Sequence, residues 1–97
     1  MYIRITTATI DIPVDTAKEQ AVMQVIDEQL IPRLRQLPGF VSYTGGQDRA
    51  TGRSVSITTW DDMEHAQGLR AAIGGLIAQF EALGIRFEPA QLYEVVR

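Results

Sequence analysis

The stretch from Phe40 to Trp60 constrains the fold more than any other part of the chain. Two segments with the composition of β-strands, Phe40–Asp48 and Arg53–Trp60, flank the turn-forming sequence DRATG. A connection of this length joins neighbouring antiparallel strands. The sequence therefore predicts a β-hairpin in the middle of the chain.

A helical pattern precedes the hairpin. Thr16 is placed to cap a helix, with Glu19 three residues later to reach back, which is the capping-box arrangement. Behind it, apolar residues recur at helical spacing as far as Leu37. Pro32 lies inside that series and cannot donate a backbone hydrogen bond, so we expect a kink or break near Leu30 and Ile31.

A second helical pattern follows the hairpin. Asp61 can cap this helix, again with an acid, Glu64, three residues later. The pair Gly74–Gly75 interrupts the pattern and is expected to divide it into two helices. The apolar positions that define the buried face are Leu69, Ile73, Leu76, Phe80 and Leu83.

Strand-like segments stand at both ends of the chain. Tyr2–Ile12 is rich in isoleucine and threonine, and Gln91–Val96 follows Pro89. The predicted order is therefore β-α-β-β-α-β, an α+β, ferredoxin-like fold with an antiparallel sheet. The chain of 97 residues fits one domain, residues 1–97.

The helices of such a fold cover only one face of the sheet, and the other face needs a partner. A chain this short buries only about 60–65% of the surface its unfolded form exposes, so association with a second copy is expected. Alternation along Arg53–Trp60 puts Val55, Ile57 and Thr59 on one face. The other face, which we expect to pair with the sheet of a second copy in a homodimer, carries Ser54, Ser56, Thr58 and Trp60, together with Tyr93.

Composition excludes several classes of function. The chain has no cysteine, which rules out disulfides, a thiolate nucleophile and a cysteine-type zinc site. A net charge of −3 with scattered basic residues argues against a nucleic-acid partner. The apolar stretch AAIGGLIA is far shorter than the roughly 20 residues of a membrane span, and the N-terminus lacks the pattern of a signal peptide. A cytoplasmic location is expected.

Two motifs carry a family resemblance: LPGF at Leu37–Phe40, and Trp60 followed by an acid-rich helix start. With these, the chain resembles the antibiotic biosynthesis monooxygenase-like (ABM) proteins of the dimeric α/β-barrel superfamily. The resemblance implies a homodimer that acts without a cofactor on a small aromatic, quinol-type or polyketide-like compound, whose anion supplies the electrons. The alternative is a non-catalytic dimer that binds a small molecule or has a stress-response or accessory role.

The haem-degrading branch of that family matches less well. It shares a tryptophan at the position of Trp60, but it also uses an asparagine on the first strand and a haem-ligating histidine further along the following helix. This sequence contains no asparagine and offers Thr6 or Thr7 on the first strand. Its single histidine lies in the first turn of the helix, whereas the ligand position would fall near Arg70. Haem degradation is therefore disfavoured.

Several residues are candidates for a site. The resemblance makes Trp60 a pocket-lining residue, with Thr7 and Tyr43 as hydrogen-bond partners. The candidate contacts for an anionic or phenolic ligand are Arg4, Tyr43, Arg70 and Tyr93. His65 is the candidate general base, since its ordinary pKa is near neutrality. Each has a structural alternative: tryptophan as a hydrophobic plug, tyrosine and arginine as packing residues, and histidine at the rim. The neighbouring acids are explained by helix capping, so no metal site is predicted.

Overall fold

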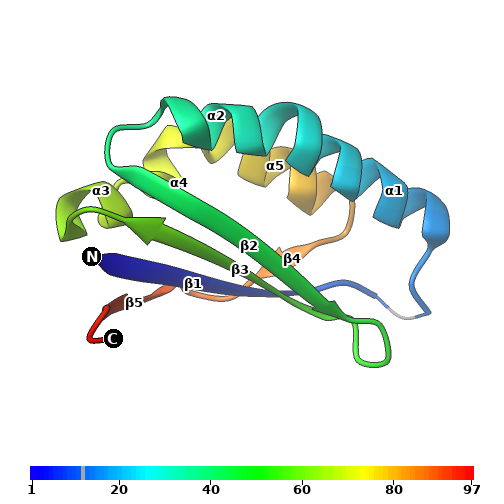
Figure 1. Ribbon diagram of the computed structural model, residues 1–97. Helices are drawn as coiled ribbons and strands as arrows, with labels where there is room; N and C mark the ends of the chain where they lie inside the picture. The colour runs from blue at the N-terminus through cyan, green and yellow to red at the C-terminus, as the bar shows by residue number, and fades with distance from the viewer. Residues whose placement is uncertain (12) are drawn as a thin grey trace.

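The computed structural model describes residues 1–11 and 13–97. The predicted order of elements is recovered with two differences: the helices are interrupted, and a short strand at Arg86–Phe87 that was not predicted precedes the last strand (Figure 1). The last strand ends at Glu94 and not at the expected Val96. The first strand ends at Thr9, so the expected strand was too long: Ile10 and Asp11 are not part of it, and Ile12 lies outside the described residues. The elements are β1 (Tyr2–Thr9), α1 (Thr16–Val25), η1 (Ile26–Leu30), α2 (Ile31–Gln36), β2 (Phe40–Asp48), β3 (Arg53–Trp60), α3 (Met63–Gln67), α4 (Leu69–Ala72), α5 (Gly74–Ala82), β4 (Arg86–Phe87) and β5 (Gln91–Glu94).

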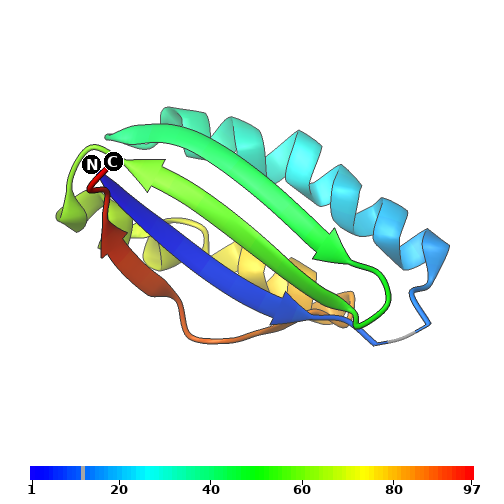
Figure 2. The same ribbon diagram turned by 60° about the horizontal axis from the view of Figure 1, so that its bottom comes forward.

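The sheet is antiparallel, with strand order β2-β3-β1-β4, and β5 also pairs with β1. All the helices lie on one face, and Figure 2 shows the opposite face uncovered. The predicted α+β class, ferredoxin-like order and β2–β3 hairpin are confirmed. None of the helices in the described part of the chain is long and apolar enough to cross a membrane.

The prediction of which face of the strands meets the helices was wrong. Trp60 and Thr58 are 1% and 4% exposed, and Trp60 packs with residues of α2, α3 and α4. Val55, Ile57 and Thr59 lie on the uncovered face and are half-buried. Alternation separates the two faces but does not say which one the helices cover, and the hydroxyl-rich face was mistaken for a dimer seam. Tyr93 does lie on the uncovered face, opposite Ile3.

The first helical stretch changes geometry ahead of its proline. Asp15, not the expected Thr16, caps α1, and its carboxylate accepts from the N–H groups of Ala17 and Lys18. The expected irregularity near Leu30 appears as the π-helical η1, where Ile31 donates to the carbonyl of Ile26. Pro32 follows directly and has no N–H to continue the α-helical ladder.

The second helical stretch is divided, as expected, before Gly74, and it is also divided at Gly68. Asp62, and not Asp61, caps α3 by accepting from the N–H of His65. These short helices press their apolar faces on the sheet at the end where β3 finishes. The buried core between the helices and the sheet consists of Leu30, Leu34, Trp60, Ala66, Leu69, Leu76 and Phe80. Phe80 packs against Phe87 near the end of the sheet where β3 begins.

Candidate functional site

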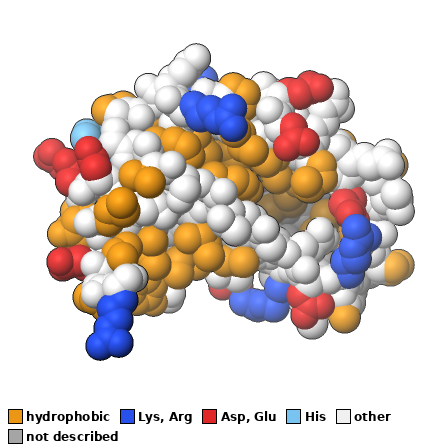
Figure 3. All heavy atoms as spheres, in the orientation of Figure 1, with side chains coloured by type: hydrophobic (Ala, Val, Ile, Leu, Met, Phe, Trp, Pro, Cys, Tyr) orange, Lys and Arg blue, Asp and Glu red, His pale blue; other side chains and the backbone are white. Residues whose placement is uncertain are grey.

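A cavity of about 420 Å³ lies between the sheet and the helices that cover it. Figure 3 shows the molecule hollowed beside β2, with hydrophobic side chains in the hollow. A cavity of this size is in the range of about 300–1,000 Å³ that small-molecule sites occupy. It is therefore the first candidate for a ligand site.

The sheet side of the cavity is polar, and strand register explains why. Residues paired across antiparallel strands point to the same side, and neighbouring strands are about 4.7–4.9 Å apart. Three rows of side chains from β2, β3 and β1 consequently face the helices. They are Tyr43, Thr58 and Arg4; then Gly45, Ser56 and Thr6; then Gln47, Ser54 and Ala8.

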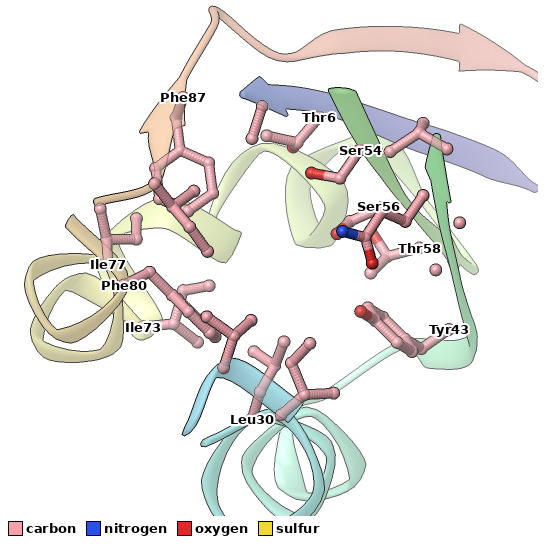
Figure 4. Close-up of a pocket in the computed structure, with 18 of the residues that line it drawn as sticks. Thr6, Leu30, Tyr43, Ser54, Ser56, Thr58, Ile73, Ile77, Phe80 and Phe87 are labelled. Carbon is pink, nitrogen blue, oxygen red and sulfur yellow. The ribbon is translucent and has the colours of Figure 1, made fainter. Parts of the chain in front are cut away.

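The helix side of the cavity is mostly apolar, with the charged Glu19, Asp27 and Arg70 among its lining residues. Leu30 comes from η1, Ile73, Ile77 and Phe80 come from the second helical stretch, and Phe87 comes from β4 (Figure 4). The cavity thus has a hydroxyl-bearing floor and a hydrocarbon roof. An aromatic molecule with polar substituents on one side matches this arrangement.

Tyr43 owes its position to a glycine. Its hydroxyl points into the cavity (Figure 4) and lies over Gly45, where a Cβ atom would come within 2.9 Å of the Tyr43 oxygen. The structure therefore places this predicted site residue on the cavity wall.

Trp60, also predicted to line the pocket, instead packs in the core. Its ring lies edge-on to Phe40, with centroids 5.6 Å apart, and its indole N–H donates to Oγ1 of Thr58 at 2.8 Å. Thr58 lines the cavity. Because its oxygen accepts from the indole, its own hydroxyl hydrogen remains for a ligand. The indole thus holds the side chain of Thr58, which lines the cavity, while Trp60 itself is not among the described residues that line it.

The other predicted ligand contacts divide between the two faces. Thr7 pairs with Val55 and points to the uncovered face, whereas Thr6 takes the cavity position. Arg70 lines the cavity from α4, although its side chain is exposed. Arg4 joins it from β1 and donates from Nη1 to the carbonyl of Ala66 at 3.1 Å.

His65 lies outside the group of described residues that line the cavity. Its Nδ1 is 2.7 Å from Oδ1 of Asp61, and both atoms abut Gly39, whose φ of +79° suits glycine alone. The hydrogen bond to Asp61 raises the pKa of His65, and the same hydrogen bond lowers the pKa of Asp61. The pair lies against the turn before β2, and the backbone N–H of Asp61 donates to the carbonyl of Gly39 at 2.9 Å.

One group in the described part of the chain has the donors for a cation. The ligand atoms of Asp61, Asp62 and His65 lie within 4.8 Å of one another. The carboxylates are exposed, and that of Asp62 is already used as the cap of α3. Capping and the pair with His65 account for these residues without a metal.

Three hydroxyls of the cavity floor were assigned to the wrong face by sequence reasoning. Ser54, Ser56 and Thr58 form the alternating series Ser-x-Ser-x-Thr in β3. Small hydroxyl side chains repeated on one face leave space that larger apolar residues would fill. That pattern was the signal for an internal polar wall.

Comparison with known proteins places the fold. No family model matches the chain, and no curated protein sequence matches it. A Deinococcus radiodurans protein assigned to the antibiotic biosynthesis monooxygenases superimposes with a TM-score of 0.77 at 17% identity, over 100% of this chain and 94% of that one. The chain has the ABM monooxygenase fold.

Two further structures with this fold belong to oxygenases. SnoaB, a cofactor-independent oxygenase from Streptomyces nogalater, aligns with a TM-score of 0.66 at 20% identity, over 99% of this chain and 93% of its own. A Streptomyces coelicolor monooxygenase in complex with nanaomycin D aligns with a TM-score of 0.68 at 17% identity, over 95% and 82%. At these identities the comparisons establish the ABM fold, as the LPGF and Trp60 motifs indicated.

Proposed function

We propose that the chain is a cofactor-independent monooxygenase-like protein whose substrate is a small electron-rich aromatic compound of the quinol or polyketide type. The observation that carries the proposal is the cavity, with hydroxyls on one side and hydrocarbon on the other. SnoaB is a cofactor-independent oxygenase and the Streptomyces coelicolor protein is a monooxygenase, and their having the same fold supports the reaction class.

In this reaction the protein must orient the substrate and stabilise its anion. A phenolic ring with an activated CH₂ group loses a proton, and the resulting anion gives electrons to O₂. One oxygen atom becomes the new ring carbonyl, the other leaves as water, and the four-electron oxidation of CH₂ to C=O balances the reduction of O₂. The apolar roof would exclude water, and the hydroxyls would hold the anion's oxygen.

Named residues have distinct parts in this proposal. Thr58 donates to the anionic oxygen, with Tyr43 and Ser56 as neighbouring donors on the same floor. Arg70 adds positive charge at one end of the cavity. The substrate's proton passes to water at the cavity opening, and His65 has no direct contact with the ligand.

Dithranol, an electron-rich anthrone, tests the reaction directly. The purified protein is incubated with dithranol under ¹⁸O₂, and the dihydroxyanthraquinone product is measured by mass spectrometry. The proposal predicts faster conversion than in buffer, with one labelled oxygen per product molecule. Thr58→Val should reduce the protein-dependent rate, while His65→Gln should not. A rate equal to that in buffer would contradict the oxygenase proposal.

The position of His65 favours one second candidate. The only histidine of the chain is held by Asp61 away from the cavity, so no histidine base faces the ligand. A non-catalytic protein that binds an aromatic small molecule, with an accessory or stress-response role, fits this arrangement. It would bind the same phenols saturably and consume no oxygen.

We also propose that the chain forms a homodimer through the uncovered face of its sheet. That face presents half-buried Ile3, Ile5, Val55 and Ile57 among threonines. Pairing two such faces would remove this apolar surface from water. Native mass spectrometry should give a dimer, and Ile57→Lys should give a folded monomer. A monomeric wild-type protein would contradict this assembly.

A further inference from the structure

Arg4 stands at one end of the cavity floor without a counter-charge. Its guanidinium makes one hydrogen bond, from Nη1 to the carbonyl of Ala66. Its Nε is buried and has no hydrogen-bond partner among the described residues. A buried N–H of a charged group that lacks an acceptor is costly, so the described protein does not fully satisfy this guanidinium. A ligand in the cavity would meet its outer nitrogens, because Nε has almost no accessible surface.

The acidic and basic residues that line the cavity differ in whether they form ion pairs. Two of its three carboxylates are already in ion pairs: Glu19 with Arg49 and Glu88 with Arg53. The third, on Asp27, is exposed on η1. Arg4 and Arg70 both line the cavity and neither forms an ion pair with a described residue.

The two arginines also repel each other. Burial lowers the pKa of Arg4, and the neighbouring guanidinium of Arg70 lowers it further. Burial and the charge of Arg70 both disfavour the charged form of the Arg4 guanidinium, and a bound anion would offset both effects. The guanidinium presents planar N–H groups that match a carboxylate, which a hydroxyl cannot do.

We propose that Arg4 and Arg70 form an anion subsite and that the cavity's ligand is an aromatic compound with a carboxylate next to a phenolic hydroxyl. This inference rests on the proposed function, because it assumes that the same cavity holds the aromatic ring. Thr58 is the direct cross-strand neighbour of Arg4, and Tyr43 is the next residue in the same row. A carboxylate on Arg4 therefore leaves an adjacent phenolic oxygen within reach of these two hydroxyls.

An ortho-hydroxynaphthoate and its neutral carboxamide form a matched pair of probes with nearly the same shape. Their dissociation constants are measured by fluorescence titration. The subsite predicts that the wild-type protein binds the carboxylate at least about tenfold more tightly than the carboxamide, which is the lower end for a charge-assisted hydrogen bond. Raising the salt concentration should reduce this preference.

Arg4→Gln should abolish the preference through a loss of carboxylate affinity that is larger than the loss of carboxamide affinity, because the carboxamide loses only a neutral hydrogen bond. Arg70→Gln should reduce the preference and is safe for folding because the residue is exposed. Arg35→Gln removes an exposed charge of α2 outside the cavity and should change nothing. Thermal melting of each variant separates lost binding from lost folding.

The outcomes separate this inference from the proposed function. Equal affinity for the two probes would overturn the anion subsite and leave the aromatic site intact. A preference that survives in folded Arg4→Gln and Arg70→Gln alike would also overturn it. Failure of both probes to bind would overturn the subsite together with the aromatic site on which it depends.

Discussion

Replacing Gly45 by alanine should move Tyr43 without damaging the fold. The backbone of Gly45 has no positive φ, so alanine suits it. The added Cβ would lie 2.9 Å from the Tyr43 hydroxyl and 3.5 Å from Cζ of the same ring. Real Cβ atoms are hardly ever found this close to another heavy atom, so the phenol must swing away by several tenths of an ångström.

The magnitudes predict opposite effects on binding and stability. Loss of one neutral hydrogen bond to the ligand costs about 0.5–1.5 kcal/mol, which is about a two- to twelvefold weaker dissociation constant. Glycine to alanine at an unstrained position instead stabilises a protein by about 0.4–1 kcal/mol through the unfolded chain. The melting temperature should therefore stay level or rise by a few degrees.

The assay is a fluorescence titration with the hydroxynaphthoate, with thermal melts in parallel. Gly46→Ala is the control, because its Cβ would meet only Val55, at an ordinary 3.5 Å, and would not approach Tyr43. In a Tyr43→Phe background, which lacks the hydroxyl, Gly45→Ala should weaken binding much less. Wild-type affinity in Gly45→Ala, or the same loss with and without the hydroxyl, would refute the proposed role of Tyr43.

Three more results are expected. Leu34→Ala should cost about 2–5 kcal/mol in denaturant unfolding, because Leu34 is fully buried; a loss under 1 kcal/mol would contradict the packing. Trp60→Phe should destabilise the protein and also weaken phenol binding, because Thr58 loses its hydrogen bond from the indole. Undiminished phenol binding would show that this hydrogen bond is not needed to position Thr58. Because the pKa of His65 is raised, its pair with Asp61 stabilises the fold below about pH 6.5 and this contribution disappears as pH rises through the folded-state pKa. Melts across this range should show that dependence in the wild-type protein and lose it in His65→Gln.

The order of elements could be predicted because each signal was local. The DRATG turn, the helical spacing of apolar residues and the effect of Pro32 depend on neighbours in sequence. The capping residues were each misplaced by one position, to Thr16 and Asp61 in place of Asp15 and Asp62, because several side chains in each turn can accept the same N–H groups.

The site could be predicted only in part because it depends on which face of the sheet is covered. Neighbouring residues of a strand point to opposite faces, so Thr6 lines the cavity where Thr7 was predicted to do so. For the same reason, the face that was expected to form the dimer interface is the floor of the cavity. Tyr43 and Arg70 were named as ligand contacts and do line the cavity. The importance of Gly45 could not be predicted from the sequence, because it lies in the space that this glycine leaves for the side chain of Tyr43.

The central claim is that the cavity between sheet and helices binds an aromatic compound. The most direct test is a titration of ¹⁵N-labelled protein with the redox-inert dihydroxyanthraquinone, followed by two-dimensional NMR. Saturable shifts should concentrate at Gly45, Ser56 and Thr58 on the floor and at Ile73 on the roof, and His65 should be little affected. Shifts confined to the uncovered sheet face or to the start of α3, or no shifts at all, would contradict the account.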